Sequence, residues 1–136
     1  MDREVVEQKL ESLRKRLRRV ETKCPTDAAN LIADFDLQDI VSLNLSRAVQ
    51  ISVDIGAHLI AGMDVPPPDT MGQTFDLLAR EGVLNAELAN NLKKAVGFRN
   101  IATHNYENIN WEIVHNIAKF QLADFSEFAK VVAERL

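Results

Sequence analysis

Residues 36–61 of this chain read DLQDIVSLNLSRAVQISVDIGAHLIA, and their apolar side chains recur at helical spacing. The apolar face expected from that spacing consists of Leu37, Ile40, Val41, Ala48, Ile51, Ile55 and Leu59. Residues three and four apart lie on the same side of an α-helix, so the pattern predicts one long amphipathic helix. Asp36 stands at a capping position before it, and Gly62 with the run Pro66-Pro67-Pro68 ends it in a loop.

The segment before this helix predicts two more helices. An a/d stripe that steps by four and three residues runs through the first of them, over Val6, Leu10, Leu13, Leu17 and Val20. Pro25 follows the end of that stripe. Thr26 or Asp27 can then cap a short helix that reaches about Asp34.

Three further helices are expected on the C-terminal side of the long one. Their expected starts are Asp69 or Thr70, Asn85 and Asn110, which are residue types favoured at N-caps. Gly82 is the expected end of the first, and the third is expected to continue to the end of the chain. The apolar residues expected to face inward are Phe75, Leu77, Leu78, Leu88, Leu92, Ala95, Val96, Phe98, Ile113, Ile117, Phe120 and Phe128.

No alternating strand pattern of useful length interrupts these helices, and short loops join them. That organisation favours an all-α fold, an antiparallel helical bundle. No linker, internal repeat or low-complexity segment divides the sequence. Residues 1–136 are therefore expected to form a single domain.

The bulk composition predicts a cytoplasmic protein. The chain is 46% hydrophobic and 26% charged, which is ordinary for a globular domain. Its one cysteine, Cys24, cannot form an internal disulfide, and no Cys/His spacing indicates zinc. The N-terminus lacks the pattern of a signal peptide, and no apolar run approaches the roughly 20 residues that span a bilayer. We therefore expect no membrane association.

The net charge of −4 is unevenly distributed. Residues 1–23 hold eight of the sixteen Lys and Arg residues and five of the twenty acids, whereas the remainder of the chain is acidic. A basic first helix on an acidic body can attract a polyanion locally. The alternative interpretation is an ordinary solvated helix face.

Residues 99–106, Arg-Asn-Ile-Ala-Thr-His-Asn-Tyr, carry the most distinctive chemistry of the chain. Arginine binds phosphate through a fixed fork of donors, and histidine transfers protons near neutral pH. Arg99 and His104 together are a minimal set of side chains for cleaving a phosphodiester without a metal. The alternative is that these are ordinary surface and hydrogen-bonding groups near a helix end.

Helical spacing separates these residues by direction. Asn100 and His104 are four apart and share a face, so Asn100 can orient the imidazole or contact a substrate. Arg99, Thr103 and Tyr106 form a neighbouring stripe. Arg99 and His104 point about 140° apart on an ideal helix. They can converge through the length of arginine, through fraying near Asn105, or across a two-fold axis with a second subunit.

Asn105 tolerates the left-handed conformation that ends many helices. The segment is therefore expected to lie at a helix terminus. A homodimer would bring two histidines together, one to act as an acid and one as a base.

The stretches 97–101 (Gly-Phe-Arg-Asn-Ile) and 104–106 (His-Asn-Tyr) resemble the HEPN superfamily, specifically the HepT-type toxins with their Arg-x4-His-x-Tyr motif. The resemblance extends upstream through residues 44–50 (Asn-Leu-Ser-Arg-Ala-Val-Gln), Val53-Asp54-Ile55 and His58. It also includes the proline-rich loop, the segment from Phe75 to Leu78, and Gly82. In all it covers about residues 36–120.

The resemblance implies a helical bundle that forms a homodimer, with paired motifs lining a cleft. Members of the family are typically metal-independent endoribonucleases of toxin–antitoxin systems, and the antitoxin is a small nucleotidyltransferase. Carried onto this chain, Arg99 and His104 would be catalytic, Asn100 would assist, and Tyr106 would be the AMP acceptor. The expected product is a 2′,3′-cyclic phosphate, because the 2′-OH of RNA supplies the nucleophile. The alternatives are a non-catalytic subunit that binds the nucleotidyltransferase, and a plain helical scaffold.

Two other polar groups have more than one interpretation. Asn44, Arg47, Asp54 and His58 form a stripe on the long helix that can line the cleft, contact the antitoxin, or simply hold an Arg47–Asp54 pair on an exposed face. Glu112 and His115 match the Glu-x-x-His spacing of di-iron bundles, but the sequence has no second copy. We therefore expect no metal and no cofactor.

Lys93 and Lys94 precede Arg99 by one to two turns. They can follow the phosphates of a bound RNA or be ordinary solvated helix residues. Trp111 is expected in the core or in an interface.

Overall fold

A computed structural model describes residues 2–136, and within that range the chain is built from helices without any strand. The elements are α1 (Arg3–Lys23), α2 (Ala28–Ile32), α3 (Phe35–Ala61), α4 (Met71–Arg80), α5 (Ala86–His104), the 3₁₀ helix η1 (Tyr106–Asn108), α6 (Trp111–Phe120) and α7 (Leu122–Glu134). The predicted all-α class is confirmed. No helix in the described part of the chain is both long and apolar enough to cross a membrane.

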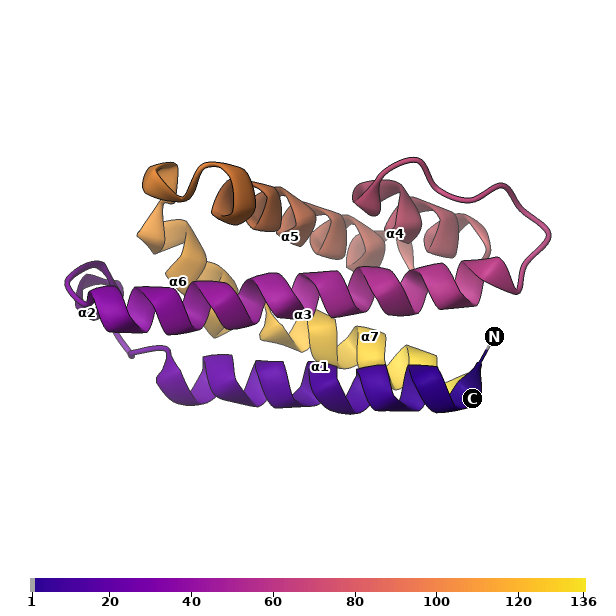
Figure 1. Ribbon diagram of the computed structural model, residues 1–136, viewed down its shortest axis with the longest axis horizontal. Coiled ribbons are helices and arrows are strands. Elements are labelled where there is room, and N and C mark those ends of the chain that lie inside the picture. The colour runs from indigo at the N-terminus through magenta and orange to yellow at the C-terminus, as the bar shows by residue number, and fades with distance from the viewer. Residues whose placement is uncertain (1) are drawn as a thin grey trace.

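Helix α3 is the element against which the others are arranged. Figure 1 shows α1 running antiparallel beside it, α5 along its other side, and α7 behind the seam between α1 and α3. Helices α2, α4 and α6 also contact α3. The bundle therefore surrounds one long helix, which fixes where α5 ends.

The start of α3 differs by two residues from the prediction. Its N-cap is Asp34, whose Oδ1 accepts a hydrogen bond from the backbone N–H of Leu37 at 3.1 Å. Asp36, the predicted cap, lies inside the first turn. Two acidic residues two positions apart both suit an N-terminus, and the sequence alone does not decide which one adopts the extended backbone of a cap. The predicted end at Ala61, with Gly62 following, is confirmed.

The buried side of α3 is wider than its predicted apolar face. Leu37, Ile40 and Ile51 are only partly buried, whereas polar residues are fully inside. Ser52 and Asn44 are compatible with burial because their side chains donate hydrogen bonds back to carbonyls of their own helix, at 2.8 Å each. A helix with neighbours on several sides buries positions that an amphipathic pattern would assign to solvent.

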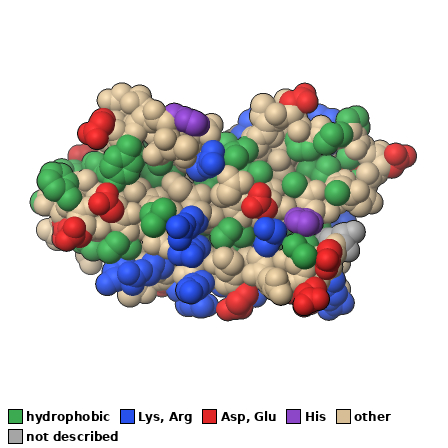
Figure 2. Space-filling view, in the orientation of Figure 1, with side chains coloured by type: hydrophobic (Ala, Val, Ile, Leu, Met, Phe, Trp, Pro, Cys, Tyr) green, Lys and Arg blue, Asp and Glu red, His purple; other side chains and the backbone are tan. Residues whose placement is uncertain are grey.

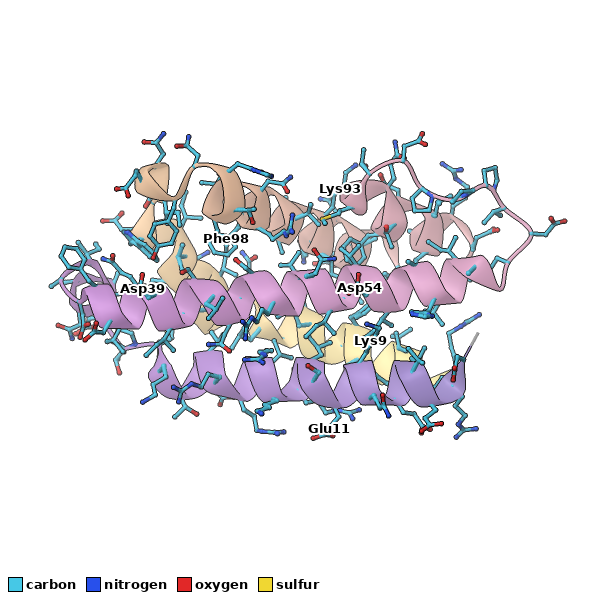
Figure 3. The ribbon with its side chains drawn as sticks, viewed as in Figure 1. Lys9, Glu11, Asp39, Asp54, Lys93 and Phe98 are labelled. Atoms are coloured by element: carbon cyan, nitrogen blue, oxygen red, sulfur yellow. The ribbon has the colours of Figure 1, made fainter. Side chains whose placement is uncertain are left out.

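The core consists of two clusters of buried side chains. The larger one joins α1, α3, α4, α5 and α7, and the edge-to-face pair of Phe75 and Phe128 lies within it with ring centroids 5.9 Å apart. The smaller cluster lies under α2 and α6 and includes Phe98 from α5. Figure 3 shows Phe98 on the stretch of α5 that approaches the end of the bundle. Burial of Phe98 thus anchors the helix one residue before Arg99.

Three of the predicted helix boundaries depend on local capping and are confirmed. Thr70 accepts from the N–H of Gln73 at 3.2 Å, and Asn85 accepts from the N–H of Leu88 at 2.7 Å. Gly82, just after α4, has φ +76°, a conformation that glycine adopts without steric cost.

The last predicted helix is in fact two helices. Asn110 caps α6 as expected, accepting from the N–H groups of the next turn, but the helix ends at Phe120 and α7 begins after Gln121. Helix α6 packs on α2, whereas α7 packs on α1, so the chain changes direction between them. Ile113 and Phe120, predicted to face inward, are exposed at 56% and 75%, because α6 turns the side that carries Val114, Ile117 and Ala118 toward the core.

Gly56 lies where α3 packs tightly against α4. A methyl group built at this position would lie 2.5 Å from Cγ2 of Thr74, whose side chain is buried. We expect Gly56→Ala to lower the free energy of unfolding by about 1–3 kcal/mol through overpacking. The measurement is a urea denaturation curve.

Gly97→Ala is the matched control, because Gly97 is also helical but has open space around its Cα. There the substitution should stabilise the protein by roughly 0.5–1 kcal/mol through helix propensity. Equal effects of the two substitutions would contradict this account of the α3–α4 contact.

Candidate functional site

The predicted motif lies where α5 leaves the bundle. Helix α5 stays regular through His104, and the N–H of Asn105 still bonds to the carbonyl of Ile101 at 2.8 Å. The expected helix terminus is confirmed. Asn105 itself has φ −151° and ψ 52°, so it ends the helix without adopting the left-handed conformation that many helix ends use.

Arg99 and Asn100 open onto a pocket of about 500 Å³ between α5 and the start of α4. Its lining residues are Thr70, Met71, Gly72, Lys93, Val96, Gly97, Arg99 and Asn100. Lys93, labelled in Figure 3, forms an ion pair with Asp76 at 2.9 Å. That pairing favours a structural role for Lys93 over one in following phosphates. Arg99 has no such partner among residues 2–136, so its N–H donors are available to a ligand in this pocket.

The three motif side chains on α5 have no polar partners in the described part of the chain. Arg99 is half-buried, and Asn100 and His104 are exposed. Across residues 2–136, none of these three side chains makes a hydrogen bond or an ion pair. Polar groups that are held by a helix but left without internal partners are free to bind a ligand.

The geometry narrows the ways in which Arg99 and His104 can act together. Because α5 remains helical through His104, fraying does not bring the two side chains together within the motif. Asn100 and His104 share one side of the helix, and Arg99 points away from them. The routes that remain are the length of the arginine side chain and a second subunit.

Tyr106 is separated from the α5 residues by the end of the helix. It begins η1, and its hydroxyl donates a hydrogen bond of 2.6 Å to Oδ1 of Asp39. Its ring packs edge-to-face with Trp111 at 5.8 Å between centroids. The stripe predicted through Arg99, Thr103 and Tyr106 therefore stops at Thr103, since Tyr106 is turned toward α3.

Tyr106 borders two pockets on the surface. One, of about 380 Å³, lies between α3 and α5, and its lining includes Ser42 and Thr103. The other, of about 480 Å³, includes Phe35 and Trp111. Asp39 and Tyr106 line both. The tyrosine is 37% exposed, so it is held in place and is still reachable from solvent.

The surroundings of Tyr106 raise the pKa of its phenol. Partial burial is the largest cause, followed by the hydrogen bond to Asp39. The charges of Asp39 and Glu107 act in the same direction, while a hydrogen bond with Ser42 opposes them. The hydroxyl therefore keeps its proton at neutral pH.

Asp39 was not among the residues that the sequence pointed to. It precedes Tyr106 by 67 positions and belongs to no motif. Figure 3 shows it near the start of α3. Its one recognisable feature in the sequence is that it occurs among apolar residues of the long helix, which is too general to indicate a site.

The predicted polar stripe of α3 does not act as a unit. Asn44 is buried and accepts a hydrogen bond from Arg16 of α1 at 3.2 Å. The Arg47–Asp54 pair does not form within the described residues, because Asp54 instead accepts from Gln50 at 3.0 Å and lies 3.8 Å from Lys9. Burial of Asn44 removes it from any cleft.

The other two members of that stripe stay accessible to different degrees. Arg47 is exposed and His58 is partly buried. Their predicted role in lining a cleft or contacting a partner remains a hypothesis.

The basic side chains of α1 are partly neutralised. Figure 2 shows Lys and Arg side chains gathered along α1 on the face in view. Three of them pair with acids: Arg3 with Glu7, Lys9 with Asp54, and Arg18 with Glu11. This favours the interpretation of α1 as a solvated helix face.

His115 has a structural contact. Its Nε2 lies 2.9 Å from the carbonyl oxygen of Pro25, which ties α6 to the turn before α2. No group of three His, Cys, Asp or Glu side chains that could hold a metal occurs among residues 2–136. Trp111, expected in the core or an interface, is partly buried and supports the ring of Tyr106.

Comparison with known proteins identifies the family. The model of the ribonuclease HepT-like family matches residues 7–132, and this chain belongs to that family. Among characterised proteins, the chain is 33% identical over 129 residues to the mRNA nuclease HepT of Shewanella oneidensis, covering 95% of this chain and 96% of that protein.

Solved structures of toxin–antitoxin complexes have the same fold. One contains the tri-AMPylated Shewanella oneidensis HEPN toxin in complex with the MNT antitoxin, at a TM-score of 0.90 and 32% identity, covering 98% of this chain and 99% of that one. Another is a toxin–antitoxin with AMP-PNP, at a TM-score of 0.90 and 31% identity, covering 96% and 98% of the two chains. The HepT-type resemblance inferred from the motif is thus confirmed.

The chain has one tyrosine, so titration of Tyr106 can be followed directly by phenolate absorbance. We expect it to ionise above the ordinary pKa of about 10. In Asp39→Asn the pKa should fall but remain elevated, because burial is the larger cause. An unchanged titration in Asp39→Asn would contradict the contact.

The same pKa shift predicts how stability depends on pH. Because the pKa of Tyr106 is raised in the folded protein, its contribution to stability is present below the pKa of the unfolded chain. That contribution is lost as the pH rises through the folded pKa.

Proposed function

We propose that this chain is the toxin of a toxin–antitoxin pair, a metal-independent endoribonuclease of the cytoplasm that a nucleotidyltransferase antitoxin silences by AMP transfer onto Tyr106. The observation that carries the proposal is that Arg99, Asn100 and His104 stand on a regular, anchored helix without hydrogen-bond or ion-pair partners among residues 2–136. Membership of the HepT-like family supports the reaction class, since its characterised relative is named an mRNA nuclease.

The roles follow from the chemistry of each side chain. His104 transfers a proton to or from the reacting oxygens, and Arg99 stabilises the charge that develops on the phosphoryl group. Asn100, one turn before His104 on the same face, positions the imidazole or the substrate. Attack by the 2′-OH of the RNA yields a 2′,3′-cyclic phosphate, and no step requires a metal.

A homodimer completes the site in this proposal. The regular helix keeps Arg99 and His104 pointing about 140° apart, so one straight helix presents them poorly to a single phosphate. A two-fold axis beside α5 would place Arg99 of one subunit opposite His104 of the other. The exposed apolar side chain of Ile101, on α5 between these residues, suits such an interface.

AMP transfer onto Tyr106 supplies the regulation in this proposal. Two relatives support it, one a toxin described as tri-AMPylated and bound to its MNT antitoxin, the other a toxin–antitoxin holding an ATP analogue. A nucleotide on Tyr106 adds a bulky anion two residues from His104. Such a group blocks RNA both sterically and by repulsion of its phosphates.

Removal of either catalytic side chain should abolish cleavage. We expect Arg99→Ala and His104→Ala to lower the rate of RNA cleavage by roughly 10²–10⁴-fold, because each removes transition-state stabilisation or proton transfer. Cleavage of labelled RNA in the presence of EDTA measures both the loss and the independence from metal. Tyr106→Phe serves as the control and should remain active. Full activity of the folded Arg99→Ala or His104→Ala protein would disprove the assignment.

Mixed dimers test whether the site is shared between subunits. Co-expression of Arg99→Ala and His104→Ala chains gives heterodimers in which one of two composite sites is intact, so about one quarter of wild-type activity should return. Each variant alone should be inactive. If the mixture is as inactive as its parents, the site does not consist of Arg99 from one subunit and His104 from the other.

A further inference from the structure

The hydrogen bond between Tyr106 and Asp39 affects how Tyr106 loses its proton when AMP is added, a modification that belongs to the function proposed above. The phenolic hydroxyl is the donor, and Oδ1 of Asp39 accepts at 2.6 Å. A tyrosine that receives a nucleotide must lose this proton. The hydrogen bond therefore already contains a donor and an acceptor in the arrangement that proton transfer needs.

The environment of Tyr106 makes a proton acceptor necessary. Burial and the negative charges of Asp39 and Glu107 raise the pKa of the phenol, so spontaneous ionisation is suppressed near neutral pH. No Lys, Arg or His side chain bonds to the Tyr106 oxygen in residues 2–136, so no cation stabilises a phenolate there. The neutral hydroxyl is a poor nucleophile unless a base takes its proton during attack.

We propose that Asp39 accepts the phenolic proton of Tyr106 when AMP is transferred from ATP. In this step a bond forms between the Tyr106 oxygen and the α-phosphorus of ATP. The bond from that phosphorus to the oxygen bridging the β-phosphate breaks, and pyrophosphate leaves. The proton passes from the phenol to the Asp39 carboxylate and then to water, so the substrate protein supplies the base for its own modification.

The placement of the two residues suits this role. Tyr106 is 37% exposed and Asp39 is also exposed, so the tyrosine side chain is accessible from solvent while its hydroxyl stays in contact with a proton acceptor. Trp111 packs edge-to-face on the tyrosine ring and limits its movement. Asp39 sits near the start of α3, the helix most surrounded by the bundle, so its backbone position is fixed.

The test compares rates of AMP transfer to three forms of the chain. Wild type, Asp39→Asn and Glu107→Gln are incubated with ATP and the cognate nucleotidyltransferase, and added AMP is followed by intact mass. Asparagine keeps the size of the side chain and an accepting oxygen but cannot take the proton. Glu107→Gln is the matched control, because it removes a neighbouring charge that raises the same pKa without touching the hydroxyl.

We expect transfer to Asp39→Asn to be roughly 10–100-fold slower than to wild type near neutral pH. The deficit should shrink as the pH approaches the pKa of the phenol, since hydroxide then replaces the missing base. Glu107→Gln should be modified at least as fast as wild type. RNA cleavage by unmodified Asp39→Asn, which leaves Arg99 and His104 in place, should match wild type and confirms that the variant is folded.

Several results would overturn the inference. If Asp39 only suppressed ionisation, Asp39→Asn would be modified faster than wild type, because removing the carboxylate lowers the pKa of the phenol. Equal slowing by Asp39→Asn and Glu107→Gln, or a deficit that does not change with pH, would assign Asp39 to contact with the antitoxin. A wild-type chain that gains no AMP, or a Tyr106→Phe chain that still gains it, would refute the proposed modification itself.

Discussion

The burial of α3 on several sides is the constraint on which this structure depends. Thirteen of its 27 residues are buried, and every other α-helix in the described chain contacts it. Its interior includes serine and asparagine, which are accommodated because they return hydrogen bonds to their own helix. A helix held from so many directions cannot shift without disturbing both core clusters, so it serves as a rigid reference for the elements around it.

The chemistry of the chain is organised relative to that helix. Helix α5 runs along α3 and is anchored by Phe98, so that Arg99, Asn100 and His104 emerge where the packing ends. Tyr106 then turns back to α3 and bonds to Asp39. Residues expected to cleave RNA are left without internal partners, whereas the residue expected to be modified is tied to the scaffold. One short segment thus keeps the residues proposed for catalysis apart from the residue proposed for its regulation.

Prediction from the sequence succeeded where local rules apply. The caps at Asn85 and Asn110 follow from a side chain bonding to the next turn, which the sequence displays directly. Prediction failed where two nearby residues suit the same cap equally well. It also failed where packing against distant helices sets a helix boundary. Asp34 and Asp36 are equivalent candidates for one cap, and the break at Gln121 exists because α6 and α7 pack on different helices.

The sequence by itself determined the all-α class, most helix boundaries and the residues of the Arg-x4-His-x-Tyr motif, because periodicity, capping and motif spacing are properties of nearby residues. Only the tertiary structure decided which residues far apart in the sequence contact one another. Asp39 meets Tyr106, Asn44 turns inward to Arg16, and His115 contacts the turn at Pro25. These contacts join positions 28 to 90 residues apart, and such pairings are set by how helices pack, a property that no local pattern records.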